Sequence, residues 1–475
     1  MATLSWTSDP VIFAILSVSA AGLILVTTAG ISIFRPALGL IFFFVFFAFA
    51  WRLCSVLYIG LFGPVFSEQL ERHIGPGSAV LPIALAQGLV IVALLWSFRE
   101  ARVCALFAEG APVMSSRVAG GGFELADAAF WLAGFFVVVL WAELLTSGPI
   151  PVFTGMERFD YSRLYGGWLH RLLIEWGPML AFQLGLFLVA PTFRDHPSDW
   201  RFGALFASLI LYLFLVGHRF SSFYAYSSFF VIPIGVAILA RQTLQQRPLF
   251  SAAVVRNITI VGAILCVLVV GAVAYSYMVV RGFEGALLFT KLSQRILVQQ
   301  GEMWWATFER VFLRDNWNGA HAAYKVFVDP FDPGRNSTMQ FLMEEALPHA
   351  RAHLILDLGS AYTGGWPEIL FELGGPVGGF LLVAASAVIF SEFMFLLTRC
   401  IVQERFATCF FLTPVLYALM ITVVSGMLNS FVQLTFLLKL SVALLVYLAE
   451  DRWRGTLPLL PAADSNSHAG LQGSP

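Results

Sequence analysis

Residues 203–240, GALFASLILYLFLVGHRFSSFYAYSSFFVIPIGVAILA, decide the fold class of this chain. Two apolar runs, 203–216 and 221–240, flank a Gly-His-Arg turn at 217–219. An apolar run of about 18 residues is long enough to cross a bilayer as a helix, and such runs recur along the chain. The composition agrees, because 59% of the residues are hydrophobic and 12% are charged, against about 25% charged in soluble domains. The sequence therefore predicts an all-α polytopic membrane protein.

The apolar runs predict about eleven membrane-spanning helices, within a range of about ten to twelve. Their expected limits are 11–31, 37–62, 79–98, 125–148, 172–191, 203–217, 221–240, 257–280, 368–398, 406–425 and 430–449. The chain is then divided into helices one to eight over 1–280, a large loop with amphipathic helices over 281–367, helices nine to eleven over 368–450, and a disordered tail over 451–475. Within the loop, residues 292–313, LSQRILVQQGEMWWATFERVFL, are amphipathic and aromatic. This pattern predicts a helix lying at the membrane interface.

The distribution of arginine predicts the orientation of the chain. One set of short loops is rich in arginine and the opposite set is poor, and the rich set faces the cytoplasm. The rich set holds Arg35, Arg99, Arg102, Arg117, Arg194, Arg201, Arg241, Arg247, Arg256, Arg399, Arg405, Arg452 and Arg454. We therefore expect the N-terminus outside, the C-terminus inside and the loop 281–367 outside.

Charged side chains gather in or beside the outer ends of the predicted spans. They are Arg52, Glu143, Glu175, Arg219, Glu368 and Glu372. A charge near hydrocarbon is costly and tends to face a cavity or a partner. Several charges at one depth therefore predict one polar cavity that opens outward. The alternative is that each side chain extends separately to the lipid headgroups.

Arg219 lies in the turn between two predicted spans, at the expected boundary between membrane and water. Its guanidinium offers a planar fork of donors that matches phosphate oxygens. At this depth it suits the diphosphate of a lipid-linked substrate, where it also stabilises charge that develops on a leaving group. The alternative is an interfacial anchor, because arginine and tyrosine are common at headgroup level.

Motifs of other chemistries are absent from the sequence. The chain has no phosphate-binding G-x-x-x-x-G-K-[ST], no H-E-x-x-H and no G-x-S-x-G. Its five cysteines have no paired spacing, which argues against a disulfide framework or a zinc site. We therefore expect no metal and no cofactor.

Three segments, in this order, carry a family resemblance. Residues 148–167, GPIPVFTGMERFDYSRLYGG, resemble the G-x-I-P-L segment followed by Asp and Arg in bacterial oligosaccharide repeat-unit polymerases. Residues 216–226, VGHRFSSFYAY, resemble the G-x-R turn of that family. Residues 359–379, GSAYTGGWPEILFELGGPVGG, resemble its segment that ends a long periplasmic loop and enters the next span. The chain thus resembles the Wzy-type O-antigen or exopolysaccharide polymerases, relatives of the O-antigen ligases, over roughly 145–380.

The resemblance implies a membrane glycosyltransferase with a GT-C-like fold in the bacterial inner membrane. It would act at the periplasmic face on glycans linked to undecaprenyl diphosphate. A hydroxyl of one lipid-linked unit would attack the anomeric carbon of the growing chain, and undecaprenyl diphosphate would leave. No metal and no nucleotide sugar would be required. The expected partners are the lipid-linked glycan, the bilayer, a flippase and a chain-length regulator, and no nucleic acid.

The resemblance also implies roles for individual residues. Arg219 and Arg295 are the candidates for contact with the diphosphate, and Glu368 is the candidate general base. The candidate substrate-binding residues are His218, Asp160, Arg163, Tyr362, Glu372, Gln300 and Trp304.

One departure from the relatives bears on the choice between activities. The ligases carry a histidine early in the third segment, where this chain has Gly359 and Ser360. His349 and His353 lie upstream and are alternative bases. The departure argues more against a ligase than against a polymerase. A ligase, a flippase for lipid-linked sugars and a structural subunit of an export complex remain the alternatives.

Overall fold

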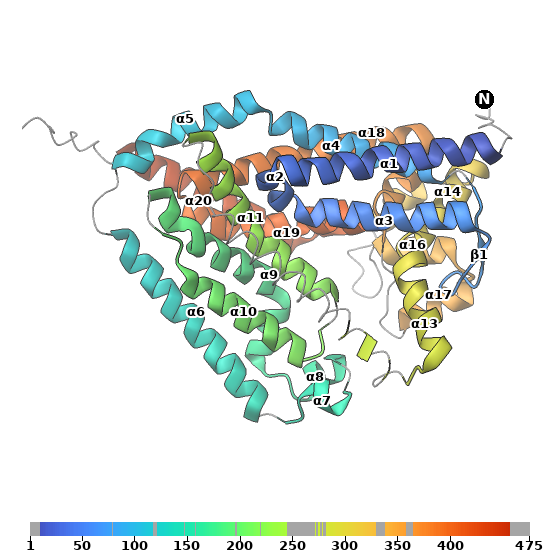
Figure 1. Cartoon of the computed structure of the whole chain (residues 1–475), viewed down its shortest axis with the longest axis horizontal. Coiled ribbons are helices and arrows are strands. Elements are labelled where there is room, and N and C mark those ends of the chain that lie inside the picture. The colour runs from blue at the N-terminus through green and yellow to red at the C-terminus, as the bar shows by residue number, and fades with distance from the viewer. Residues whose placement is uncertain are drawn as a thin grey trace, which may run out of the picture.

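Long apolar helices make up most of the protein (Figure 1). The computed structural model describes residues 10–77, 79–116, 121–146, 148–156, 158–194, 197–218, 220–244, 271, 274–275, 278, 282–328, 338–357 and 364–456. The longer helices are α1 (Pro10–Phe34), α3 (Phe43–Phe62), α4 (Val80–Ser97), α5 (Glu100–Ser116), α6 (Gly121–Thr146), α9 (Trp168–Val189), α10 (Trp200–Leu215), α11 (Phe220–Leu244), α18 (Glu368–Val402), α19 (Phe406–Ser425) and α20 (Leu434–Thr456). The prediction of an all-α membrane protein is confirmed in outline, with one short hairpin of β1 (Val65–Ser67) and β2 (Arg72–Ile74).

Shorter elements connect these helices. They are α2 (Pro36–Ile41), α7 (Pro151–Thr154), α8 (Arg158–Leu164), η1 (Ala190–Arg194), α13 (Gly285–Ser293), η2 (Gln294–Val298), α14 (Glu302–Phe308), η3 (Glu309–Leu313), α15 (Gly319–Ala323), η4 (Tyr324–Val328), α16 (Thr338–Ala346), α17 (His349–Asp357) and η6 (Leu428–Val432). The elements η2, η3 and η4 are single π-helical turns.

Eight helices in the described part are long and apolar enough to cross a membrane. They cover Ala14–Phe34, Phe43–Phe62, Val80–Ala108, Ala126–Thr154, Trp168–Phe193, Phe220–Thr243, Glu368–Val402 and Phe406–Ser425. The predicted span 203–217 corresponds to α10, which is apolar but shorter. The predicted span 430–449 corresponds to α20, which contains Lys439 and ends in charged residues from Glu450 onward. Most of the predicted span 257–280 lies outside the described residues.

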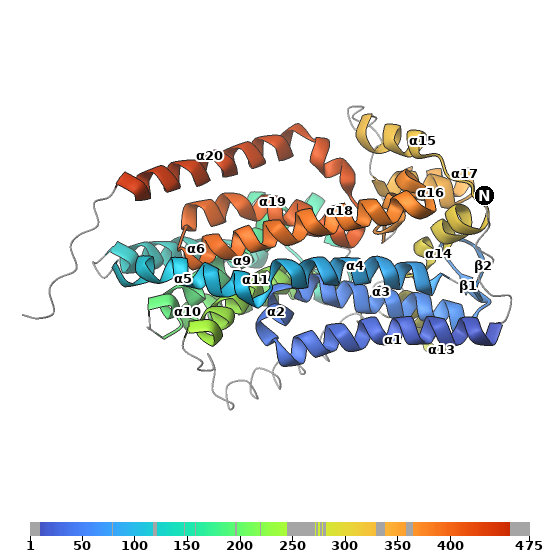
Figure 2. The same cartoon turned by 90° about the horizontal axis from the view of Figure 1, so that it is seen from above.

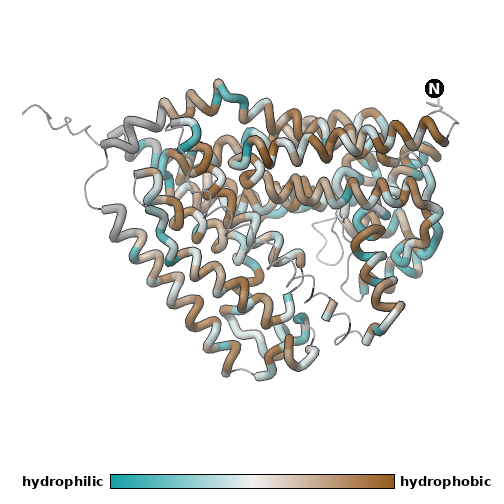
Figure 3. Tube along the Cα trace, viewed as in Figure 1, coloured by the Kyte–Doolittle hydropathy of each residue, from teal (hydrophilic) through white to brown (hydrophobic). Residues whose placement is uncertain are grey.

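The elements of the large loop gather at one end of the molecule. Helices α13 to α17 and the β1–β2 hairpin lie beside the beginning of α1, whereas the end of α20 lies at the opposite end (Figures 1 and 2). Figure 3 shows that hydrophobic residues dominate the long helices and that many hydrophilic ones belong to the loop elements. The first described residues and the end of the last helix thus lie at opposite ends of the bundle (Figure 2).

Small residues allow the central helices to approach closely. A Cβ on Gly185 of α9 would lie 2.2 Å from the carbonyl oxygen of Phe230 on α11. A Cβ on Gly177 would lie 1.7 Å from the hydroxyl oxygen of Tyr226. Close backbone approach at small residues is a common way for membrane helices to pack. These two glycines therefore bring α9 and α11 into direct contact.

The prediction of an interfacial helix over 292–313 is wrong for α14. Every residue of α14 is buried, including Trp304 and Trp305. A helix that is buried on all sides packs within the protein rather than on a lipid surface. The aromatic residues that suggested a lipid-facing helix are part of the core of the loop.

Candidate functional site

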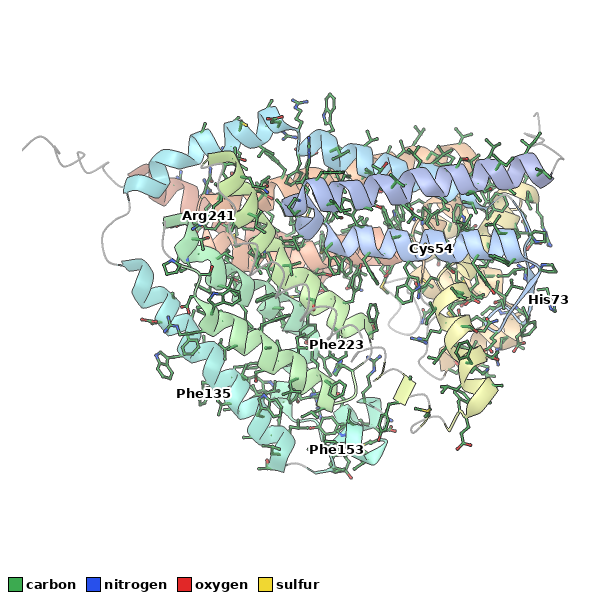
Figure 4. The ribbon with its side chains drawn as sticks, in the orientation of Figure 1. Cys54, His73, Phe135, Phe153, Phe223 and Arg241 are labelled. Atoms are coloured by element: carbon green, nitrogen blue, oxygen red, sulfur yellow. The ribbon has the colours of Figure 1, made fainter. Side chains whose placement is uncertain are left out.

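The middle of α3, at Trp51 and Ser55, contacts two segments that are far apart in the sequence. The indole N–H of Trp51 donates to the carbonyl of Ile296 at 2.9 Å, and the hydroxyl of Ser55 donates to the carbonyl of Leu297 at 2.8 Å. The ring of Trp51 also lies 5.5 Å from the ring of Phe220, measured between centroids. Helix α3 therefore holds η2 beside the beginning of α11. In Figure 4, the labelled Cys54 belongs to α3 and the labelled Phe223 belongs to α11.

This arrangement bears on both predicted diphosphate ligands. Arg295 immediately precedes Ile296 in η2 and is half-buried. The described part of the chain places no carboxylate within ion-pair distance of its guanidinium. Arg219 itself lies outside the described residues, but the ring of its neighbour Phe220 contacts Trp51. Phe220 and Ile296, the residues that follow the two arginines in the sequence, thus both contact Trp51 of α3.

Arg52 and Glu368 form a buried ion pair between α3 and α18. The Nη1 of Arg52 lies 3.2 Å from Oε2 of Glu368. Glu368 is fully buried and Arg52 is 6% exposed. The backbone N–H groups of Gly365 and Glu368 also face this carboxylate. Glu368, the predicted general base, thus forms an ion pair with Arg52, and the sequence alone did not predict this pairing.

The backbone at Gly364 covers this ion pair. Its φ of +113° lies in the region that favours glycine. A Cβ at Gly364 would lie 2.9 Å from Nη2 of Arg52 and 3.5 Å from Oε1 of Glu368. Glycine is therefore needed at this position both for the backbone conformation and for space.

A second buried carboxylate of α18 is held differently. Arg310 in η3 donates to both oxygens of Glu372, from Nε at 3.2 Å and from Nη2 at 2.7 Å. Arg310 also pairs with Glu345 of α16. Glu372, a predicted substrate-binding residue, therefore connects α18 to the loop through two hydrogen bonds from Arg310.

The first two resemblance segments meet in a cluster of polar side chains. The turn residue Gly217 approaches Pro151 of α7, where a Cβ on the glycine would lie 3.8 Å from the proline Cβ. The ring of His218 lies 6.2 Å from the ring of His170, and Nδ1 of His170 is hydrogen-bonded to the hydroxyl of Tyr212 at 2.9 Å. Gly217 and His218 are therefore packed against α7, within the first segment, and against α9, directly after it.

Two further contacts fix these histidines. Nδ1 of His218 is hydrogen-bonded to the hydroxyl of Ser222 at 2.9 Å. The backbone N–H of His170 donates to Glu143 of α6 at 3.2 Å. Burial, together with the nearby Arg158 and His170, lowers the pKa of His218 to about 3. His218 is therefore neutral near pH 7 and contributes a hydrogen-bonding group rather than a charge.

The remaining predicted substrate-binding residues are dispersed. Asp160 and Arg163 are both exposed on α8. Gln300 is half-buried in the turn after η2. Trp304 is fully buried, and its indole N–H donates to the carbonyl of Ala79 at 2.7 Å, so it supports the loop core. Tyr362 lies outside the described residues.

The charges expected in one cavity belong instead to separate contacts. Glu143 binds the backbone of His170, Glu368 pairs with Arg52, and Glu372 pairs with Arg310, while Glu175 is exposed. The structure thus joins two of the expected charges, Arg52 and Glu368, and gives Glu143 and Glu372 other partners. A single outward-opening cavity stays a prediction.

The alternative bases of the loop lie on α17. The rings of His349 and His353 stack on each other, with centroids 4.9 Å apart. His349 is exposed and His353 is half-buried. Of the three base candidates, Glu368 is the one that is both buried and paired with a cation.

A third buried carboxylate joins the hairpin to the loop. The hydroxyl of Ser67 in β1 donates to Oε2 of Glu302 in α14 at 2.5 Å. The other oxygen, Oε1 of Glu302, is buried and accepts no hydrogen bond from the residues that the structure describes. Burial raises the pKa of Glu302 to about 7, and the nearby Glu68 adds to the effect, while the hydrogen bond from Ser67 opposes it.

Residues that sequence reasoning missed differ in the signal they gave. His170 comes three residues after the first segment, and its position there is a signal that the sequence offers. Tyr212 lies within an apolar run and Arg310 within an amphipathic one, so neither was distinguished by its surroundings. Glu302 was expected on a surface and is buried.

Comparison with known proteins gives a match to the third segment. Residues 332–440 match the model of a family of unknown function (DUF6418). The matched range includes α18 with Glu368 and Glu372. No curated protein matches the chain, and no solved structure matches it. The roles of the residues therefore have to be argued from their geometry.

Proposed function

We propose that this protein is a membrane glycosyltransferase that polymerises oligosaccharide units linked to a polyprenyl diphosphate. The proposal rests on the three resemblance segments and above all on the meeting of η2 and the start of α11 at Trp51. That contact brings Phe220 and Ile296, the residues that follow Arg219 and Arg295 in the sequence, to one side chain of α3. Two guanidinium groups at a membrane boundary suit the two phosphates of a lipid diphosphate.

In this proposal the arginines bind the diphosphate and stabilise it as it leaves. Glu368 takes the proton of the acceptor hydroxyl. The neutral His218 and its hydrogen-bonded neighbours hold the turn in place. Charge on the leaving group develops where the basic residues gather, so the same residues serve binding and catalysis.

We propose eleven spans in the bacterial inner membrane, with the N-terminus in the periplasm. The beginning of α1 and the end of α20 lie at opposite ends of the bundle, which requires an odd number of crossings (Figure 1). Adding α10, the predicted helix 257–280 and α20 to the eight apolar helices gives eleven. The loop elements lie at the end of the bundle where α1 begins, which is the periplasmic end in this orientation.

The test is deletion of the gene in its host, with gel profiling of surface polysaccharide. Complementation uses wild type, Arg219→Ala, Arg295→Ala and, as a matched control, Arg171→Ala, an exposed arginine of α9. We expect single repeat units on the surface after deletion. We expect wild type and the control to restore the ladder, and the other two variants to fail while being expressed at normal levels.

The other outcomes identify the alternatives. Chains of full length that do not reach their final acceptor would make the protein a ligase. Lipid-linked units that accumulate on the cytoplasmic side would make it a flippase. An unchanged ladder after deletion would contradict the proposal.

A further inference from the structure

Helix α13 and the π-helical turn η2 that continues it cover residues 285–298, and we call them the α13–η2 segment. None of the residues of α13 is buried. Phe289 is 79% exposed, and Leu287 and Ile296 are each 50% exposed. Large exposed apolar side chains that gather on one segment mark a surface that contacts lipid or another protein. The apolar side of this segment therefore calls for an occupant.

The long polar side chains of the same segment bind the protein instead. The ammonium of Lys291 pairs with Glu68, in the turn between β1 and β2, at 2.9 Å. The side-chain amide of Gln294 donates to the carbonyl of Phe66 in β1 at 2.8 Å. A helix on a water-exposed surface does the reverse, because its apolar face packs on the protein and its polar face meets water. The α13–η2 segment is therefore suited to apolar surroundings on its outer side.

The segment is attached to a helix that can cross a membrane. The last carbonyl groups of a helix have no partner within it, and in η2 they accept hydrogen bonds from the side chains of Trp51 and Ser55. Both residues belong to the candidate span Phe43–Phe62. Tryptophan is enriched at the boundary between lipid and water. This attachment favours lipid, rather than a soluble partner, as the neighbour of the exposed side chains.

The direction of the segment agrees with this location. In Figure 1, α13 runs across the direction of α1 and α3, and Figure 2 places it on the same side of the bundle as α1. Interfacial helices lie along the membrane plane and therefore run across the spans. Only the four residues 281–284 separate α13 from the predicted span 257–280. In that prediction α13 begins next to the membrane boundary.

We propose that the α13–η2 segment is an interfacial helix whose apolar side chains enter the lipid leaflet on the side of the loop elements. Docking then holds Arg295, which is half-buried in η2, at the level of the lipid headgroups. At that depth a guanidinium reaches phosphate while its methylene groups stay in apolar surroundings. The proposal needs a chain that spans a membrane and does not depend on polymerisation.

The experiment measures the surroundings of single nitroxide labels on the full-length protein, reconstituted into vesicles of phosphatidylcholine and phosphatidylglycerol. The five native cysteines are replaced, and a label is attached to Phe289→Cys, Val26→Cys or Asn316→Cys in turn. Val26 is 71% exposed in the span Ala14–Phe34 and is the lipid control. Asn316 is exposed in the turn before α15 and is the water control, because α15 and α13 lie on opposite sides of the bundle (Figure 2). Collisions with oxygen report lipid, and collisions with a water-soluble nickel chelate report water.

We expect the ratio of oxygen to nickel collisions for Phe289→Cys to exceed that for Asn316→Cys several-fold. It should lie below the ratio for Val26→Cys, because an interfacial label is shallower than one within a span. A second label, on Ile296→Cys, tests the docking itself. Adding Phe289→Asp should raise nickel collisions at that label several-fold, whereas adding the matched Asn316→Asp should leave them unchanged.

The other outcomes overturn the proposal. Equal nickel collisions for Phe289→Cys and Asn316→Cys would mean that the segment lies in water. Exclusion of both oxygen and nickel from Phe289→Cys would mean that protein covers it. Dipolar broadening between labels would then identify a second copy as the cover, and its absence would identify another part of the same chain. None of these results depends on polysaccharide profiles, so failure of this proposal is distinguishable from failure of the polymerase.

Discussion

Replacing Glu302 by glutamine should remove a pH dependence from the contact between the β1–β2 hairpin and α14. Glu302 is buried and accepts one hydrogen bond from Ser67, and its pKa is raised from the usual 4.5 to about 7. A group whose pKa is raised in the folded state stabilises it most below the unfolded value. That stabilisation is lost as the pH rises through the folded value. The window therefore runs from about pH 4.5 to about pH 7.

The two pKa values set the size of the effect. Their difference corresponds to about 3 kcal/mol of local stability between the low and high ends of the window. A glutamine keeps the acceptor for Ser67 and carries no charge at any pH. The variant should therefore behave at pH 8 as the wild type behaves at pH 5, apart from the cost of its own buried amide group.

Hydrogen–deuterium exchange of the detergent-solubilised protein measures this locally, at residues 65–74 and 302–308. At pH 8 the variant should be protected about 100-fold more than wild type, since about 1.4 kcal/mol is a factor of ten. At pH 5 the two should exchange at similar rates. Glu344→Gln, at a half-buried position of α16, is the control. Equal protection of wild type and Glu302→Gln at pH 8 would refute the reasoning.

Three further substitutions test other contacts by thermal unfolding in detergent. Gly364→Ala places a methyl group 2.9 Å from a buried guanidinium at a φ of +113°, and should lower stability by about 1–3 kcal/mol; no loss would contradict the strained geometry. Arg310→Gln leaves the buried Glu372 without its cation and should cost about 3–5 kcal/mol, whereas the exposed Arg314→Gln should change little. Tyr212→Phe removes one hydrogen bond to a histidine ring and should cost about 1 kcal/mol; a neutral result would mean that the bond contributes nothing.

The sequence predicted those features that depend on local composition. Runs of apolar residues reveal spans, because a helix in lipid must satisfy its own backbone and present apolar side chains. It also singled out Arg52 and Glu368 as charges in unusual places. It could not pair them, because they are 316 residues apart and no spacing rule links them. Pairing across such a separation depends on how the helices pack.

The loop was the least predictable part. Residues 302–308 have the composition of an interfacial helix, and only the surrounding elements decide whether lipid or protein covers them. Burial of Glu302 and Trp304 follows from packing against the hairpin and against Ala79. The position of His170 beside His218 likewise depends on a hydrogen bond to Tyr212. Tyr212 lies within an apolar run, so the sequence did not single it out.

The separation of Arg52 from Glu368 along the chain has a consequence for biogenesis. During synthesis α3 enters the bilayer long before α18, which supplies Glu368 316 residues later. Throughout that interval a guanidinium stands without its carboxylate in a span, where an unpaired charge is costly. The nascent protein then needs a temporary counter-ion from lipid phosphates or from the insertion machinery. Chains truncated before α18 should therefore be recognised as unassembled and degraded, however well their first spans are inserted.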